Sequence, residues 1–288
     1  MLKTVFLTDN QEKGNGVAML LGGFDGLHVG HRVLLAHAKA SGLPVGIMTI
    51  AGCKDKGIFT FAERETIFKA SGVDFVFELP FEEIKTLSPT VFLELLKNNF
   101  NPSLFVCGED FRFGIMAQGT PKTIEEWGQV RVEVLPLLEV EGKKVSSREV
   151  KQYLAAGDIP SANALLGERF FLLGEVVKDR QVGRTIGFPT ANILYPKDKF
   201  PLKQGVYESR VTVDGAAYKG ITNYGARPTF DNDRVITETY LDGFDGDLYG
   251  KALKVEFVRY LREISRFDSA ESLKKQLTKD IERVRNYD

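Results

Sequence analysis

Two histidines, His28 and His31, end a glycine-rich segment that begins at Gly22. The segment follows the apolar run 17–21, and such a run ending in glycines predicts a buried strand that turns into a loop. Helical spacing from Val29 to a stop at Gly42 places both histidines in the first helical turn. That end of a helix attracts phosphate, and imidazoles three residues apart can donate to the same group. The alternative is a capped turn carrying two surface histidines. The phosphate-binding candidates of the segment are Gly22, Gly23, Phe24, Asp25 and Gly30.

A second motif, from Gly183 to Asn192, combines glycines, a proline and polar side chains. Its glycines and proline fix an irregular loop. We expect Arg184 and Gly187 to contact phosphate, and the neutral oxygens of Thr190 and Asn192 suit a hard cation such as Mg²⁺. Because the chain has no P-loop pattern, phosphate binding in this half depends on this loop.

The composition is that of an ordinary globular protein. The chain has 288 residues, of which 43% are hydrophobic and 27% charged, and its formal net charge is −1. This length predicts two domains, and the near-zero charge offers no bulk field for nucleic acid or an anionic membrane. We expect a cytoplasmic enzyme without a membrane span or leader, and the sequence leaves its oligomeric state open. Cys53 and Cys107 exclude a disulfide framework; they are either buried inert thiols or a redox-sensitive pair.

The two halves of the chain differ in periodicity. Residues 1–166 alternate strand-like and helix-like segments, which predicts a doubly wound parallel sheet that holds ligands beyond the carboxyl ends of its strands. In residues 167–288, short strands follow one another before a terminal helix, which predicts an antiparallel β-barrel. The predicted strands are 17–21, 45–50, 73–79, 104–107, 130–135, 170–177, 206–213, 218–223, 235–241 and 253–260. The predicted helix caps are Thr60, Ser88, Thr120, Ser147 and Asp268.

The His-x-Gly-His pattern, together with Phe24-Asp25-Gly26, resembles the nucleotidyltransferase superfamily and, within it, the adenylyltransferase module of bacterial FAD synthetase. Segment 108–114 matches the Asp-Phe-Arg-Phe-Gly loop of that family, and segment 146–151 stands where it has Ser-Ser-Thr-x-Ile-Arg. The resemblance implies attack of the FMN phosphate on ATP, with His28 and His31 stabilising charge at the α-phosphate. It also implies triphosphate contacts from Ser146, Ser147 and Lys151, and flavin contacts from Asp110 and Arg112.

The second half resembles a riboflavin kinase. The matching motifs are Gly-Phe-Pro-Thr-Ala-Asn at 187–192, Arg-Pro-Thr-Phe at 227–230 and Asp-Leu-Tyr-Gly at 247–250. The resemblance implies that Thr190 and Asn192 hold Mg²⁺ with the ATP phosphates, that Arg227 contacts the flavin, and that Glu238 is the general base for the ribityl hydroxyl. Without the resemblance, Glu238 would be one acid on a solvated strand face.

The first half departs from its family at three points. Arg148 replaces a threonine, Lys151 replaces an arginine, and the run 49–54 lacks a Pro-His-Pro element and its long loop. We therefore expect this site to bind ATP normally and FMN poorly or differently. The leading prediction is a bifunctional enzyme that converts riboflavin to FMN and FMN to FAD with ATP and Mg²⁺. The alternatives are a riboflavin kinase with an altered adenylyltransferase domain, or a non-catalytic regulator that binds flavin or nucleotide.

Overall fold

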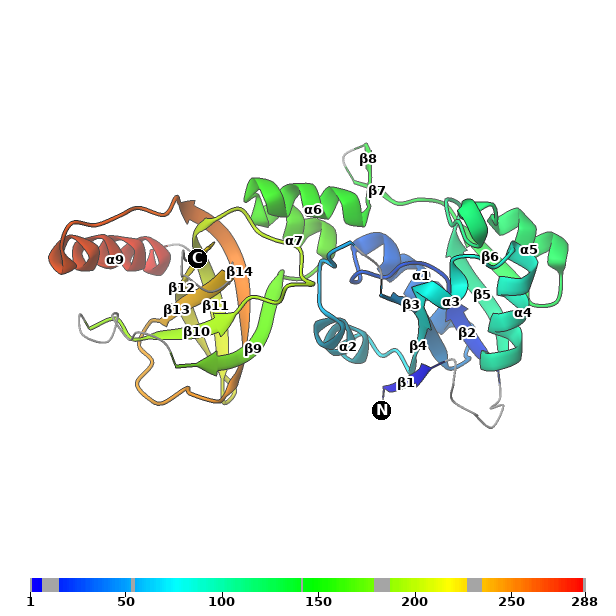
Figure 1. Ribbon diagram of the computed structural model, residues 1–288, viewed down its shortest axis with the longest axis horizontal. Coiled ribbons are helices and arrows are strands. Elements are labelled where there is room, and N and C mark those ends of the chain that lie inside the picture. Colours follow the sequence, from blue (N-terminus) through cyan, green and yellow to red (C-terminus); the bar gives the residue numbers. More distant parts are fainter. Residues whose placement is uncertain are drawn as a thin grey trace. The chain divides into compact units, whose positions relative to one another are not determined.

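Figure 1 shows the computed structural model, which describes residues 2–6, 16–52, 55–140, 142–178, 187–226 and 235–286. The chain divides into two compact units, residues 1–147 and 148–288. A parallel sheet with helices forms the first unit, and a closed barrel with helices forms the second. Both predicted fold classes are therefore confirmed.

All six strands of the sheet in the first unit are parallel, in the order β1-β4-β3-β2-β5-β6. From β2 the chain moves outward through β3 to β4, which pairs with the edge strand β1, and then returns to the other side of β2 through β5 and β6. The winding reverses between β2 and β5, and ligands bind beyond the carboxyl ends of strands at such a reversal. The strands are β1 (Lys3–Phe6), β2 (Val17–Leu20), β3 (Val45–Ala51), β4 (Phe75–Pro80), β5 (Pro102–Gly108) and β6 (Arg131–Leu135), and the separate hairpin consists of β7 (Glu139–Val140) and β8 (Lys143–Lys144).

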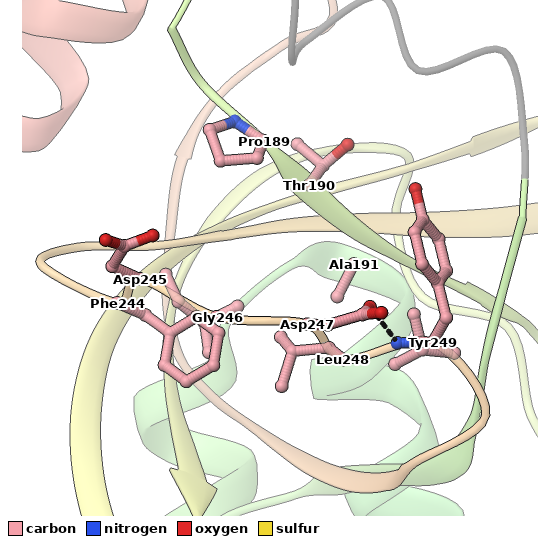
Figure 2. A pocket seen from close by; sticks show the side chains of 11 residues that line it. Pro189, Thr190, Ala191, Phe244, Asp245, Gly246, Asp247, Leu248 and Tyr249 are labelled. Atoms are coloured by element: carbon pink, nitrogen blue, oxygen red, sulfur yellow. Dashed lines mark hydrogen bonds between the residues drawn. The ribbon is translucent and has the colours of Figure 1, made fainter.

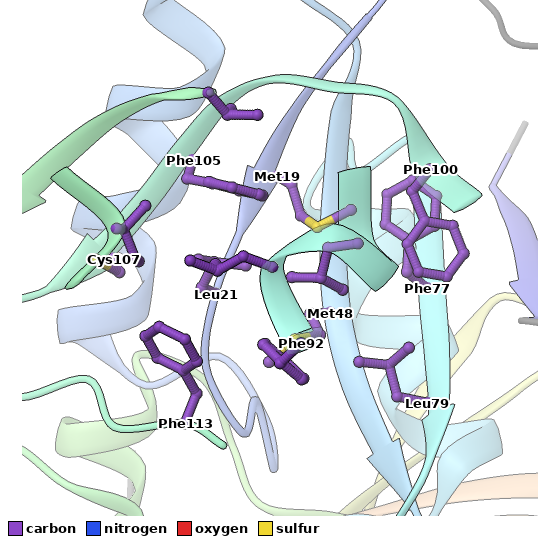
Figure 3. Packing of buried hydrophobic residues seen from close by; sticks show 14 of the residues in the cluster. Met19, Leu21, Met48, Phe77, Leu79, Phe92, Phe100, Phe105, Cys107 and Phe113 are labelled. Atoms are coloured by element: carbon purple, nitrogen blue, oxygen red, sulfur yellow. The ribbon is translucent and has the colours of Figure 1, made fainter. Parts of the chain in front are cut away.

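Helices cover both faces of this sheet. Met19 packs in the buried cluster shown in Figure 3, together with Phe92 and Leu96 of helix α4. Because alternate residues of a strand face opposite ways, Ala18 and Leu20 point to the other face, where they are fully buried and where α1 contacts β2, β3 and β5. The helices are α1 (Val29–Ala40), α2 (Phe61–Ala70), α3 (Phe81–Ile84), α4 (Pro89–Phe100) and α5 (Pro121–Trp127).

The barrel of the second unit closes in the order β10-β13-β12-β11-β14-β9, with every pair antiparallel. The terminal helix α9 (Ala270–Arg285) packs Ile281 and Val284 against Val206 and Ile221 of the barrel. The strands are β9 (Phe171–Val177), β10 (Thr190–Leu194), β11 (Gly205–Val213), β12 (Ala216–Ala226), β13 (Val235–Leu241) and β14 (Ala252–Arg262).

Three of the five predicted helix caps are confirmed. Thr60, Ser88 and Thr120 each accept a hydrogen bond from a backbone N–H three residues on. The other two predictions are wrong by one residue. Ser147 is the first residue of α6 (Ser147–Ala156) rather than its cap. Ser269 caps α9 in place of Asp268, because its extended backbone lets the hydroxyl accept the Ser272 N–H at 3.1 Å.

Helices α6 and α7 (Ile159–Leu166) fall at the end of the first predicted domain, residues 1–166, and group with the barrel in the second compact unit. The Asn163 side chain of α7 donates to the Phe257 carbonyl at 3.0 Å and accepts the Phe170 N–H at 2.7 Å. The Leu154 carbonyl of α6 accepts the Lys203 N–H at 3.2 Å. The domain boundary after residue 166 stays a prediction about independent folding, and these contacts provide a test of it.

We expect a fragment of residues 148–288 to be more stable than one of residues 168–288. The shorter fragment lacks Leu154, Ile159 and Leu166, each at most 1% exposed. Burial of each such side chain contributes about 1.5–3 kcal/mol, so the expected loss for the three is about 4.5 kcal/mol or more. Urea unfolding of the two fragments measures the difference. Equal midpoints would show that the barrel does not need α6 and α7.

Candidate functional site

The histidine turn, residues 22–31, lies at the carboxyl end of β2, where α1 begins. His28 is the N-cap of α1, and its Nδ1 accepts a hydrogen bond from the His31 N–H at 3.2 Å. The two imidazole rings are stacked, with their centroids 3.5 Å apart and an interplanar angle of 16°. The two side chains therefore share one face of the first helical turn, as predicted.

Backbone contacts fix which nitrogen of each ring carries a proton in the neutral state. His31 Nδ1 lies 3.0 Å from the Gly26 carbonyl, which can only accept, so Nδ1 is protonated and Nε2 is an acceptor. His28 Nδ1 accepts the His31 N–H, so the proton of His28 is on Nε2. The neutral pair thus offers one donor from His28 and one acceptor from His31.

Both histidines are neutral at pH 7. Burial, followed by the neighbouring His31, lowers the pKa of His28 to about 3. Burial also lowers the pKa of His31 to about 4, although the Asp110 carboxylate acts in the opposite direction. A neutral imidazole pair attracts phosphate less than a charged pair does, so further positive charge at this site has to come from other side chains.

We expect the protein to lose stability below about pH 6, because His28 and His31 take up protons at a higher pH in the unfolded chain than in the folded protein. As the pH falls from the unfolded pKa of 6.5 to the folded pKa, each histidine lowers the free energy of unfolding by about 1.4 kcal/mol per pH unit. Urea unfolding between pH 7 and 4.5 measures this slope. His31→Asn should reduce the slope by the share of one histidine, because the Asn amide can still donate to Gly26. An unchanged slope in this variant would contradict the assignment.

Two residues of the turn shape it sterically. A Cβ at Gly30 would lie 3.2 Å from His28 Nδ1, so glycine leaves the space that the ring occupies. Phe24 has φ 31, which is in the left-handed region, and its buried ring lies 4.6 Å from that of His31. Such strained backbone is found at ligand sites more often than elsewhere. Gly22 lies against the Phe24 ring, whereas Gly23 is exposed with open space around it.

Asp25 connects the turn to the segment before α2. Its Oδ1 accepts the Ile58 N–H at 2.8 Å. The carboxylate therefore holds the turn in place, and a direct phosphate contact from it stays a prediction.

A pocket of about 300 Å³, the histidine pocket, opens over the histidine turn. The turn, the loop after β5 and the start of α6 all contribute to its wall. It brings together most of the residues predicted for the first site, namely Gly22, Gly23, His28, Gly30, His31, Asp110, Arg112, Ser146 and Ser147. Lys151 belongs to the second unit, where its Nζ lies 5.7 Å from the centre of the Phe200 ring, and its part in ATP binding stays a prediction.

Lys144 is a pocket residue that the sequence analysis missed. It belongs to β8, lines the pocket beside Ser146, and its ammonium group pairs with the Asp110 carboxylate. In the sequence it stands in the polar run Gly142-Lys143-Lys144, which is indistinguishable from a solvated turn. It supplies a positive charge to a site whose two histidines are neutral.

An apolar pocket of about 320 Å³ adjoins the histidine pocket and shares four of its residues: Gly22, Gly23, Phe111 and Arg112. The side chains of Phe81, Phe92 and Phe113 form much of the remaining wall. A cavity with aromatic walls suits a flat ring system. The structure thus places a polar and an apolar cavity side by side at the point where the sheet reverses its winding.

On the barrel, Thr190 lines a pocket of about 440 Å³ opposite the turn 244–249 (Figure 2). Asp245 and Asp247 also line it, and Asp247 Oδ1 accepts the Tyr249 N–H at 3.0 Å. Gly187, before this strand, has φ 84 and open space around it. Arg184 and Arg227 lie outside the described residues, so their predicted contacts stay predictions.

Three neighbouring strands align three polar side chains in a row beside this pocket. Asn192 of β10 is paired with Glu238 of β13, which is paired in turn with Asn223 of β12. Directly paired residues lie on the same face of a sheet, and so does Thr190, two residues before Asn192. The structure therefore groups three of the residues predicted for the kinase site, Thr190, Asn192 and Glu238, and adds Asn223, which the sequence analysis did not select.

The amide oxygens of this row point to a ligand or cation. Oδ1 of Asn192 and Oδ1 of Asn223 are both buried, and neither accepts a hydrogen bond from the described residues. A buried acceptor without a donor is costly and rare, and the deficit is relieved when a ligand or ion binds. Neutral oxygens beside a carboxylate are the donor set that Mg²⁺ prefers, so Thr190 and Asn192 beside Glu238 fit that ion.

The structure gives less support to redox chemistry at the two cysteines. Cys107 is fully buried in the core, and burial raises the pKa of its thiol to about 12, which favours the inert interpretation; Cys53 lies outside the described residues. The described residues contain no group of three His, Cys, Asp or Glu side chains that could hold a metal ion. Within the same part of the chain, no helix is long and apolar enough to span a membrane.

A glycine-rich turn with paired histidines at a helix start of a doubly wound sheet, and an oxygen-rich strand face on a closed barrel, are typical of a transferase with two nucleotide-dependent sites. Comparison with known proteins agrees with this class. The FAD synthetase family model matches residues 10–149, and the riboflavin kinase family model matches residues 166–288.

Relatives that align with almost the whole chain contain both of its halves. The chain is 31% identical to the bifunctional riboflavin kinase/FMN adenylyltransferase of Bacillus subtilis, over 99% of this chain and 98% of the relative. It is 33% identical to the enzyme of the same name from Escherichia coli, over 94% and 92% of the two chains. A crystal structure described as a macrolide-efflux protein from Streptococcus pneumoniae matches with a TM-score of 0.89 and 29% identity over 99% of both chains. The chain belongs to the bifunctional riboflavin kinase/FMN adenylyltransferase family.

Proposed function

We propose that this chain phosphorylates riboflavin to FMN on its barrel and adenylylates FMN to FAD in its α/β unit, with ATP as co-substrate in both reactions. The observation that carries the proposal is the grouping of predicted residues at two separate sites, the histidine pocket and the Asn192–Glu238–Asn223 row. Family membership supplies the two reactions, and the cytoplasmic location stays an expectation from composition.

In the kinase reaction, Glu238 accepts the proton of the terminal ribityl hydroxyl. A primary alcohol is a weak nucleophile until a base takes its proton. Thr190 and Asn192 would hold Mg²⁺ with the ATP phosphates; once bound, the ion neutralises charge on the transferred phosphoryl group. The unpartnered Oδ1 of Asn192 supports this assignment.

In the adenylyl transfer, the phosphate of FMN attacks the α-phosphorus of ATP and pyrophosphate leaves. His28 donates from Nε2 to the phosphate, whereas His31 can donate from Nε2 only after it takes up a proton beside Asp110. Lys144 and the serine hydroxyls of Ser146 and Ser147 supply further polar contacts to the triphosphate. Because no covalent intermediate forms, the residues contribute alignment and charge stabilisation.

The flavin ring fits the apolar pocket beside the histidine turn. The aromatic side chains of Phe81, Phe92 and Phe113 would pack against the ring, and Arg112 borders both pockets. This cavity exists although the Pro-His-Pro element is absent, and it favours FMN as the acceptor. Weakened FMN binding stays a prediction of the sequence.

Incubation of the full chain with riboflavin, ATP and Mg²⁺, followed by chromatography of the flavins, tests the proposal. Formation of FAD supports both reactions, and accumulation of FMN alone restricts the activity to the barrel. Unchanged riboflavin would contradict the proposal and favour the non-catalytic alternative.

A further inference from the structure

Asn223 occupies a distinct place in the polar row of the barrel. Glu238 lies between Asn192 on one neighbouring strand and Asn223 on the other. Thr190 lies on the same strand as Asn192, so the two residues assigned to the metal and the phosphates are on one side of Glu238. Asn223 is on the opposite side, away from those residues.

Oδ1 of Asn223 is buried and accepts no hydrogen bond from the part of the chain that the structure describes. An amide oxygen can only accept, so its partner has to be a hydrogen-bond donor or a cation. The cation has its own ligands on β10. If Glu238 receives the proton of the reacting hydroxyl, the remainder of the polyol chain extends beyond Glu238, and hydroxyl groups are donors.

Spacing agrees with this assignment. Neighbouring strands are about 4.8 Å apart, so Glu238 and Asn223 can each contact one of two adjacent hydroxyls on the same chain. A second fixed hydroxyl determines which carbon of a flexible polyol presents its oxygen to the base. Without it, several hydroxyls could occupy the reacting position.

We infer that Asn223 Oδ1 accepts a hydrogen bond from the ribityl hydroxyl next to the one that is phosphorylated. Asn223 is thus a residue that positions the polyol and sets which of its hydroxyls reacts. The inference rests on the proposed kinase reaction and extends it to the recognition of the acceptor.

A substrate-side mutant cycle tests the inference in the full chain. The four combinations are wild type and Asn223→Ala, each with riboflavin and with an analogue in which the adjacent ribityl hydroxyl is replaced by hydrogen. We expect wild type to lose about tenfold in kcat/KM with the analogue, and the variant to lose about tenfold with riboflavin. The variant should lose little more with the analogue, because the two changes remove the same hydrogen bond.

Two further measurements separate this positioning role from other roles. Asn223→Ala should leave the KM for ATP and the Mg²⁺ dependence unchanged, whereas Asn192→Ala should alter both. The melting temperature of the free variant should not fall, because the lost oxygen has no partner among the described residues.

Multiplicative losses in the cycle, unchanged riboflavin kinetics in Asn223→Ala, or a shifted Mg²⁺ requirement in that variant would overturn the inference while leaving the kinase assignment standing. A wild-type chain that does not phosphorylate riboflavin at all would overturn the proposed function, and the inference with it.

Discussion

Replacing Glu238 with Gln should lower the rate of riboflavin phosphorylation by about 10²–10⁴-fold, because a general base contributes that much to proton transfer. Gln has nearly the same shape as Glu but cannot accept the hydroxyl proton at neutral pH. The pairing of Glu238 with Asn192 and Asn223 should survive, so riboflavin and ATP should still bind. Initial rates of FMN formation measure the loss, and calorimetry measures the binding.

Glu175→Gln is the matched control, since Glu175 is an exposed acid on strand β9 of the same barrel. This variant should keep wild-type kinase activity. A loss of less than tenfold in Glu238→Gln would show that Glu238 is not the base. Loss of ATP binding would instead show that the carboxylate belongs to the metal or phosphate site.

Replacing His31 should lower FAD synthesis by about 10²–10³-fold and leave FMN synthesis intact. His31 Nε2, once protonated beside Asp110 with the phosphate bound, is a donor that stabilises transition-state charge, and each such donor contributes roughly that factor. His31→Asn is the sharper variant. Its amide can keep the hydrogen bond to the Gly26 carbonyl that Nδ1 makes, while the Nε2 position is removed. Flavin chromatography with riboflavin as the starting substrate reports both steps in one reaction.

His37→Ala controls for the loss of a histidine from the same helix. His37 lies farther along α1, where its ring pairs with the carboxylate of Glu133, and it does not line the histidine pocket. It should leave both activities unchanged. If His31→Asn lowered both activities equally, the assignment of the two reactions to separate sites would be wrong.

The sequence was most informative where local chemistry and tertiary position coincide. The helix start at His28 could be predicted because glycines, an apolar strand and helical spacing all occur within one segment. Ten of the strands could be predicted because their apolar residues repeat or alternate over at least four positions. β1 (Lys3–Phe6) was missed, since four residues at a sheet edge provide too short a pattern, and β10 was missed because it carries Thr190 and Asn192 among its apolar residues.

The parts of the sites that could not be predicted depend on neighbours distant in the sequence. Asn223 could not be selected from the sequence, because it comes beside Glu238 only through the pairing of β12 with β13, which no local pattern reveals. Lys144 becomes a pocket residue because the β7–β8 hairpin carries it to Asp110, 34 residues earlier in the chain. The tautomers of the two histidines likewise depend on the fold of the turn, and not on the residue types alone.

The alignment of Asn192, Glu238 and Asn223 constrains which insertions and deletions this lineage can accept. Side chains alternate between the two faces of a strand, so removing one residue from β13 before Glu238 would exchange the faces of every residue in the shifted part. Glu238 would then take the side where Thr239 is hydrogen-bonded to Thr222, and a threonine would enter the polar row. We therefore expect selection to remove insertions and deletions within β13, even where every residue type is retained.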